Sequence, residues 1–174
     1  FLFSQLKTKI AAVGSVAVLM VLAVFFYVNN YKPLDKQALY ELYFEPYEAM
    51  VYRSSSDNVD NILREAMQNY ENKNYAQAII GFERVLEKDS LNVPTNFYSG
   101  ISYMEIEKYN KANHSFDVVI DQKNSLFMEQ AQWYLGFCYL MTGYNEKAKE
   151  QFKLIATSDS FYNKNARRVL RQIK

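Results

Sequence analysis

The stretch that decides the fold is Val93–Leu126, which reads VPTNFYSGISYMEIEKYNKANHSFDVVIDQKNSL. It predicts two short amphipathic helices joined by a turn near Glu107–Tyr109. Gly100 lies in the first of these helices, and Ala112 and Phe116 lie in the second. The expected unit of the fold is therefore a helical hairpin that carries small residues at fixed positions.

The same pattern recurs on both sides of this stretch. Asn69–Val85 reads NYENKNYAQAIIGFERV, and Trp133–Ile155 reads WYLGFCYLMTGYNEKAKEQFKLI. Aligning the three copies brings small residues and phenylalanines into register, with a first step of 34 residues and a second of 36. The aligned sets are Ala66, Gly100 and Gly136; Ala78, Ala112 and Ala148; and Phe82, Phe116 and Phe152.

The small residues have a packing reason. Two helices of a hairpin approach closely only where one presents glycine or alanine, so we expect Gly100 to face Ala112 and Gly136 to face Ala148. Phe116 and its equivalent in the third copy would then fill the gap beneath the next hairpin. Because one hairpin cannot cover its own apolar face, stacked neighbours must bury that face together.

These features together resemble the tetratricopeptide repeat family, in which a helical hairpin recurs every 34 residues. The resemblance covers about 59–158 and divides it into repeats at 59–92, 93–126 and 127–158. It implies an all-α superhelix of three hairpins. A capping helix within 159–174 would supply the polar outer face that the end of such a stack needs.

Seven helices are expected in this part of the chain. Their predicted bounds are Asp60–Asn72, Tyr75–Lys88, Pro94–Glu107, Asn110–Gln122, Phe127–Thr142, Asn145–Ala156 and Phe161–Ile173.

An apolar segment near the start of the chain predicts a membrane anchor. Ile10–Val28 holds 19 residues without a charge or a proline, and as a helix it would extend roughly 28 Å, close to a bilayer's ~30 Å hydrocarbon core. We therefore expect a single-pass transmembrane helix in a bacterial inner membrane. Residues 1–9 would flank it on the cytoplasmic side, and the repeats would lie in the periplasm.

Between the anchor and the repeats, 29–58 is expected to be an aromatic linker with one short helix, ended or kinked by Pro46. Tyr43–Tyr47 reads YFEPY, and this layout also resembles membrane-anchored repeat proteins of bacteria of the Bacteroidetes group. The segment Leu39–Tyr52 is apolar and aromatic and has no other obvious place to be buried. One hypothesis is that it covers a groove of the repeats.

Composition and reactive residues argue against an enzyme. The 174 residues carry a formal net charge of +1, which does not favour nucleic acid as a partner. His114 is the only histidine and has no histidine or cysteine near it, so we expect a surface residue. Cys138 is the only cysteine and is expected in the core. We therefore expect no catalytic residue, no metal and no cofactor.

The family resemblance implies that the first helix of each hairpin lines a concave groove that takes peptides. Met67, Ile101 and Phe137 occupy places where a carboxylate-binding groove would carry polar residues, so we expect an apolar groove. An exposed apolar groove of this length would need a cover: a partner, a client or the chain's own linker. Its predicted residues are Leu63, Met67, Tyr70, Phe97, Ile101, Met104, Trp133, Phe137, Leu140 and Met141.

The sequence therefore predicts a non-enzymatic, membrane-tethered scaffold or accessory subunit of a membrane complex. Its expected partners are proteins held in the groove and a lipid bilayer at Ile10–Val28, with no nucleic acid and no small-molecule substrate. The alternative is a periplasmic, chaperone-like holdase acting near a protein-export machine. Met67, Met104 and Met141 would favour the holdase, because methionine adapts to varied surfaces.

Overall fold

A computed structural model describes residues 18–26, 34–49, 58–123 and 126–173. Every element in these ranges is helical, and none of the residues described there forms a strand. The chain divides into two compact units, 1–34 and 35–174. The second unit holds the repeated hairpins, so the all-α stack expected from the sequence is present in it.

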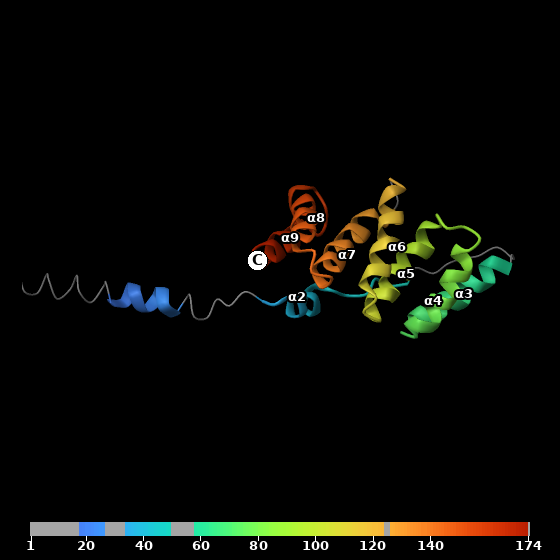
Figure 1. Cartoon of the computed structure of the whole chain (residues 1–174), viewed down its shortest axis with the longest axis horizontal. Coiled ribbons are helices and arrows are strands. Elements are labelled where there is room, and N and C mark those ends of the chain that lie inside the picture. The colour runs from blue at the N-terminus through green and yellow to red at the C-terminus, as the bar shows by residue number, and fades with distance from the viewer. Residues whose placement is uncertain (1–17, 27–33, 50–57, 124–125, 174) are drawn as a thin grey trace, which may run out of the picture. The chain divides into compact units, whose positions relative to one another are not determined.

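Three helical hairpins follow one another in the second unit (Figure 1). Each helix packs on the next one along the chain, and the last helix packs on the third hairpin. Every one of these helices begins and ends within three residues of its predicted bounds. They are α3 (Asn58–Glu71), α4 (Tyr75–Leu86), α5 (Val93–Glu105), α6 (Tyr109–Asp121), α7 (Met128–Met141), α8 (Asn145–Thr157) and α9 (Asn163–Leu170).

The three hairpin turns share one backbone device. Lys73, Glu107 and Gly143 stand at equivalent places and adopt φ values of 60°, 58° and 83°. In each turn the next amide N–H donates to the carbonyl five residues earlier, as in Asn74 to Asn69 at 2.8 Å. This left-handed residue with its 6→1 hydrogen bond is the Schellman ending of a helix. The three hairpins therefore repeat the same turn conformation as well as the same packed residues.

Packing at the glycines differs from the expected pairing of small residues. A Cβ built on Gly100 would lie 2.7 Å from the ring of Phe116, and one on Gly136 would lie 2.8 Å from the ring of Phe152. Each glycine therefore makes room for the phenylalanine of its own hairpin rather than for the alanine of the opposite helix. A short alanine leaves space between the helices, and the ring reaches across that space.

The helix before the hairpins is α2 (Lys36–Tyr43). Its N-cap is Asp35, whose carboxylate accepts from the amide of Ala38 at 2.8 Å. The helix stops at Phe44. The next residue, Glu45, directly precedes Pro46, and a residue in that position is disfavoured in helical geometry. Residues 44–49 continue without helix. This is the short helix and break that the linker sequence predicts.

The membrane anchor is a correction. No helix among the described residues combines the length and the apolar character needed to cross a bilayer. This finding contradicts the predicted single-pass transmembrane helix and the membrane localisation that rested on it. Of Ile10–Val28 the structure describes residues 18–26, which are helical. Residues 10–17 and 27–28 lie outside the described part of the chain.

Candidate protein-interaction site

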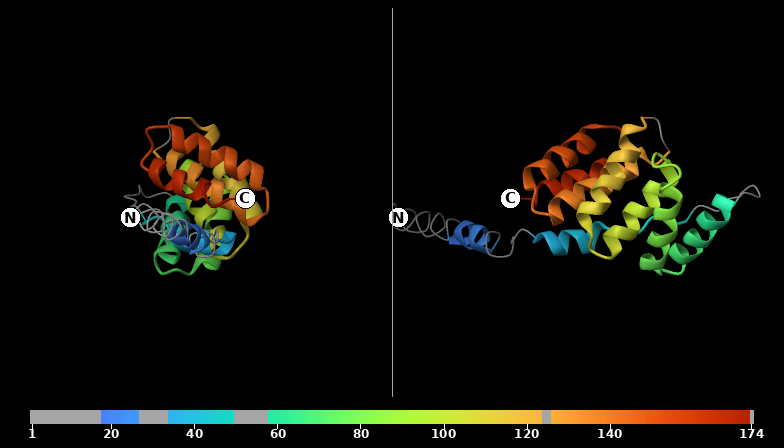
Figure 2. Two further views of the ribbon diagram at one scale, coloured as in Figure 1. Left: turned by 90° about the vertical axis from the view of Figure 1, so that its left-hand side faces the viewer. Right: turned by 45° about the vertical axis from the view of Figure 1, so that its right-hand side comes forward.

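The inner face of the hairpin stack holds a segment of the chain itself. We call residues 36–49 the strap: it consists of α2 and the six residues after it. The strap lies on the first helices of the hairpins, α3, α5 and α7, with α2 beside α7 (Figures 1 and 2). It therefore occupies the face on which the sequence predicts a groove.

Tyrosine hydroxyls fix the backbone of the strap. Tyr134 on α7 donates to the carbonyl oxygen of Glu45 at 2.8 Å. Tyr70 on α3 donates to the carbonyl oxygen of Tyr47 at 2.5 Å. Tyr98 on α5 donates to the carbonyl oxygen of Glu48 at 3.3 Å. Each hairpin thus supplies one donor to the main chain of the extended part.

One lysine secures the other end of the strap. Lys36, the first residue of α2, donates through Nζ to the carbonyl oxygen of Met141 at 3.0 Å. Met141 is the last residue of α7, where helix carbonyls have no partner within the helix and attract positive charge. The strap is therefore held at both ends.

Aromatic rings on the strap pack edge-on against rings of the inner face. The ring centroids of Tyr47 and Phe97 lie 5.3 Å apart at 80°. Those of Tyr43 and Trp133 lie 6.3 Å apart at 88°. Edge-to-face pairs of this kind contribute about 0.5–1.5 kcal/mol each beyond the area they bury. Further pairs join Tyr40 to Phe137, Phe44 to Tyr134 and Tyr47 to Phe127.

The predicted groove residues all lie in the hairpin stack, but they do not form an open groove. Phe97, Ile101, Met104 and Phe137 have no exposed surface, and Met141 is only partly exposed. Contacts between hairpins and the strap together cover this row. That these residues receive a partner stays a prediction. The others are buried as well: Leu63, Met67, Tyr70, Trp133 and Leu140.

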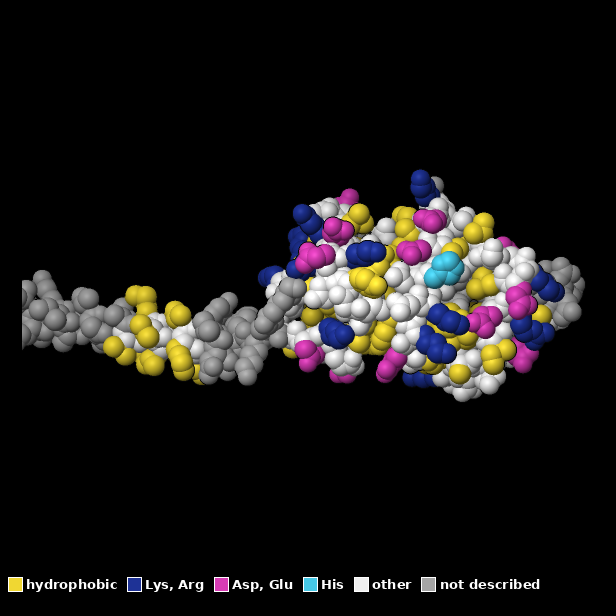
Figure 3. Space-filling view, viewed as in Figure 1, with side chains coloured by type: hydrophobic (Ala, Val, Ile, Leu, Met, Phe, Trp, Pro, Cys, Tyr) yellow, Lys and Arg dark blue, Asp and Glu magenta, His cyan; other side chains and the backbone are white. Residues whose placement is uncertain are grey.

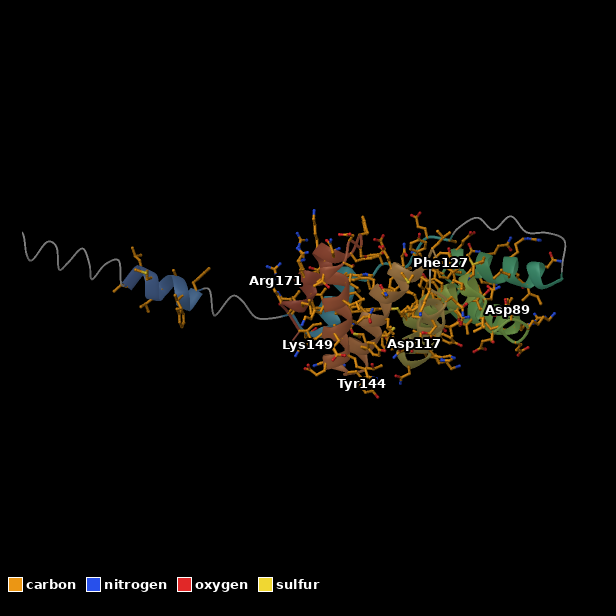
Figure 4. The ribbon with its side chains drawn as sticks, turned by 90° about the horizontal axis from the view of Figure 1, so that it is seen from above. Asp89, Asp117, Phe127, Tyr144, Lys149 and Arg171 are labelled. Carbon is orange, nitrogen blue, oxygen red and sulfur yellow. The ribbon has the colours of Figure 1, made fainter. Side chains whose placement is uncertain are left out.

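Tyr98 and Tyr134 hold the strap but were absent from the predicted groove. A signal for them exists in the sequence, because the 36-residue step that relates Gly100 to Gly136 also relates these two tyrosines. Their hydroxyls bond strap carbonyls only three residues apart. Phe127, which stacks on Phe97 at 4.4 Å, was missed because it stands at the N-cap of α7, outside the periodic pattern (Figure 4).

Burial raises the pKa of three tyrosines at this site. Desolvation is the main cause that raises the pKa of Tyr40, Tyr70 and Tyr134 above the usual value, with neighbouring phenols and carboxylates adding to it. A neutral phenol is the form that can donate a hydrogen bond. Burial likewise raises the pKa of the Cys138 thiol, which has none of the thiolate character that a reactive cysteine needs.

Beside the strap, towards α9, lies a pocket of about 600 Å³ that opens to solvent. Its walls come from the strap, from α7 and from the start of α9. The side chain next to it, Phe161, is 86% exposed. The lining residues are Tyr43, Glu45, Pro46, Tyr47, Glu48, Ala49, Trp133, Tyr134, Phe161, Tyr162 and Asn165.

Other features of the described residues do not suggest a second kind of site. No group of three or more histidine, cysteine or acidic side chains among them is placed to hold a metal ion. His114 is exposed on α6, as expected, and Cys138 is buried on α7. On the face seen in Figure 3, lysine and arginine alternate with aspartate and glutamate, so that face offers no continuous basic strip for nucleic acid.

Comparison with known proteins extends only to the fold. No protein-family model matches the chain, and no curated protein matches it. A chain in the solved structure of the CopN–Scc3 complex superposes with a TM-score of 0.56. The two are 21% identical over 83% of this chain and 89% of that one. The helical-repeat fold is therefore shared with a known structure, while the tetratricopeptide family remains a resemblance.

Proposed function

We propose that this chain is a non-enzymatic protein-binding module, a scaffold or an accessory subunit. One observation carries the proposal: the inner face of the stack holds an extended stretch of polypeptide by its main chain. A helical stack built to do this for its own strap has the chemistry to bind protein segments.

The contacts with the strap have the form of peptide recognition. Hydroxyl donors from α3, α5 and α7 reach carbonyl oxygens, which every peptide presents, while aromatic rings select the side chains between them. A buried hydrogen bond contributes about 0.5–1.5 kcal/mol net, and leaving one of these phenols unpaired would cost more. The superposed chain also comes from a protein complex, which is consistent with this role.

The structure gives no support to the holdase alternative. Exposed methionines would have favoured it, but Met67 is 5% exposed, Met104 is fully buried and Met141 is only partly exposed. The surface left for a partner is instead formed where the strap, α7 and the start of α9 meet, beside the exposed ring of Phe161.

A peptide-exchange experiment tests the proposal. In the full chain, Phe44→Ser with Tyr47→Ser should loosen the strap. A labelled synthetic peptide of residues 35–49 should then bind this variant, measured by fluorescence anisotropy, but not the unsubstituted protein. Adding Tyr98→Phe and Tyr134→Phe should weaken binding about tenfold or more, because two hydrogen bonds are lost.

A scrambled peptide of the same composition is the control. Equal binding of both peptides would favour the holdase, which would not distinguish them. If neither peptide binds the loosened variant, the inner face does not act as a receptor and the proposal fails.

Photo-crosslinking in cells would then address the partner directly. A photoreactive phenylalanine analogue at Phe161, which is 86% exposed, should give one discrete adduct. The matched position is Leu154 on α8, which is 54% exposed and does not line the pocket. Adducts of equal yield at both positions would contradict a partner surface at the strap and α9.

A further inference from the structure

The pocket beside the strap has aromatic walls and acidic charge. Six of its lining residues are aromatic, and its charged lining residues are Glu45 and Glu48, both exposed carboxylates. No lysine or arginine is among the residues that line it. The aromatic members are Tyr43, Tyr47, Trp133, Tyr134, Phe161 and Tyr162.

The two carboxylates are carried on a backbone that is held in place. The carbonyl oxygen of Glu45 accepts from Tyr134, and the carbonyl oxygen of Glu48 accepts from Tyr98. Pro46 lies between them and restricts the chain further. The acidic side chains therefore stand at the pocket on a fixed support rather than on a free loop.

The opposite wall is also positioned by polar contacts. The carboxylate of Glu129 on α7 accepts from the hydroxyl of Ser160 at 3.0 Å and from the amide of Phe161 at 3.4 Å. Tyr162 then stacks on Trp133, with ring centroids 5.0 Å apart and planes at 13°. The two aromatic residues before α9 are thus placed against the pocket from one anchored turn.

We propose that this pocket binds a cationic side chain, arginine or lysine, of a protein partner; this rests on the proposed role as a protein-binding module. Aromatic faces attract cations, and the attraction grows as the cation is desolvated. Arginine also stacks its plane on aromatic rings while it donates to carboxylates. Glu45 and Glu48 supply the acceptors, and the aromatic walls supply the stacking surface.

The charge of the lining residues decides against an anionic partner group. A phosphate or carboxylate would meet Glu45 and Glu48 with no lysine or arginine in the lining to offset them. A neutral apolar side chain would fill the aromatic part but would leave the two carboxylates without a complement. Electrostatic complementarity therefore favours the cation.

Trp133 makes the proposal directly measurable. It is the only tryptophan of the chain and it lines the pocket, so tryptophan emission reports on this place alone. The probes are two short synthetic peptides that differ at one residue, arginine in one and uncharged, isosteric citrulline in the other. The full chain is titrated with each, and binding is followed by the emission of Trp133.

We expect the arginine peptide to bind about tenfold more tightly than the citrulline peptide. Glu45→Gln with Glu48→Gln should remove that difference, because it removes the charge while the backbone hydrogen bonds to Tyr134 and Tyr98 stay. The matched control is Glu71→Gln with Glu87→Gln, which neutralises two exposed glutamates of the first hairpin. It should leave the tenfold preference unchanged.

Each outcome decides the proposal. Equal binding of the two peptides would overturn the cationic partner and would show a pocket for neutral segments. Loss of the preference in the control variant as well would overturn it too, because the effect would then be one of net charge. Absence of binding by either peptide would also overturn it. In all three cases the strap-peptide experiment still reports separately on the proposed function.

Discussion

At Gly100 and Gly136 the absence of a side chain is a packing requirement. Rings from the second helix of each hairpin lie where a Cβ would be, at 2.7 Å and 2.8 Å. Both glycines are in the middle of helices, where glycine costs about 1 kcal/mol relative to alanine. The chain accepts that cost because Phe116 and Phe152 pack fully buried against the glycine backbone.

Gly100→Ala is therefore expected to lower the free energy of unfolding by about 1–3 kcal/mol, despite alanine's better helix propensity. The reason is that Phe116 is held on all sides and cannot retreat. Urea denaturation followed by circular dichroism measures the change. Gly136→Ala should behave alike, and the exposed substitution Asn110→Ala should stay within about 0.5 kcal/mol. Equal stability of Gly100→Ala and the parent would contradict this packing account.

The buried tyrosines predict an alkaline loss of stability. Because the folded chain raises the pKa of Tyr70 and Tyr134, it retains their protons at a pH where the unfolded chain releases them. The contribution of these two tyrosines to stability is then constant below about pH 10 and falls as the pH rises beyond it. Melting temperatures measured between about pH 8 and pH 11 should show this fall. Tyr134→Phe should make it shallower, whereas replacing the exposed Tyr144 should not.

Among the elements, the hairpin helices could be predicted from the sequence, whereas the contacts of the strap could not. Hairpin helices were predictable because their apolar residues and small residues repeat. The strap could be suspected as a groove cover from its aromatic content, yet its register could not be read. Residues 44–49 have no periodicity, and their partners, such as Tyr98 and Tyr134, lie 50 and 89 residues away.

Apolar character alone left the surroundings of two segments undecided. An apolar row tells which side of a helix avoids water but not what covers it, so the row from Leu63 to Met141 predicted a groove without deciding between a partner, a client and the linker as its cover. Ile10–Val28 was read as one continuous span because it is apolar throughout. Among the described residues, which include 18–26 of this segment, no helix has the length and apolar character of a membrane span.

Within the strap, Tyr47 should matter far more than its outer neighbours. Its ring contacts Phe97 and Phe127 and its carbonyl accepts from Tyr70. We expect Tyr47→Ala to lower the free energy of unfolding by roughly 2–4 kcal/mol and to increase binding of a dye for apolar surface. The control is Leu42→Ala on α2, where the side chain is 61% exposed. A similar loss from both would mean that the contacts of the Tyr47 ring contribute no more to stability than an exposed side chain does.

At the scale of the whole stack, the strap breaks the usual rule of repeat proteins. In a plain solenoid each repeat contacts only its neighbours, so terminal repeats can unfold alone. Here the backbone of one short segment is bonded to Tyr70 of the first hairpin and to Tyr134 of the third. The first and third hairpins are therefore coupled through the strap, which both of them bind.

This coupling predicts a single cooperative transition for the intact chain. Urea unfolding followed by Trp133 emission and by circular dichroism should give coincident curves. With Phe44→Ser and Tyr47→Ser the curves should separate, since Trp133 reports on the third hairpin alone. A control with two exposed substitutions, Glu71→Gln and Glu87→Gln, should keep them together. Coincident curves in the loosened variant would show that stacking alone links the hairpins.

The separation in sequence between Glu45 and Tyr134 also determines how late in synthesis this part of the strap can be anchored. The strap leaves the ribosome before any hairpin, and the hydrogen bond from Tyr134 to Glu45 can form only after a further 89 residues have been made. At ~5–20 residues per second, translation needs roughly 4–18 s to supply that anchor. During this interval the aromatic rings of the strap have no complete surface to bind. The buried rings of the strap, such as Tyr40, are thus accessible to other proteins while the chain is being made, before the hairpins cover them.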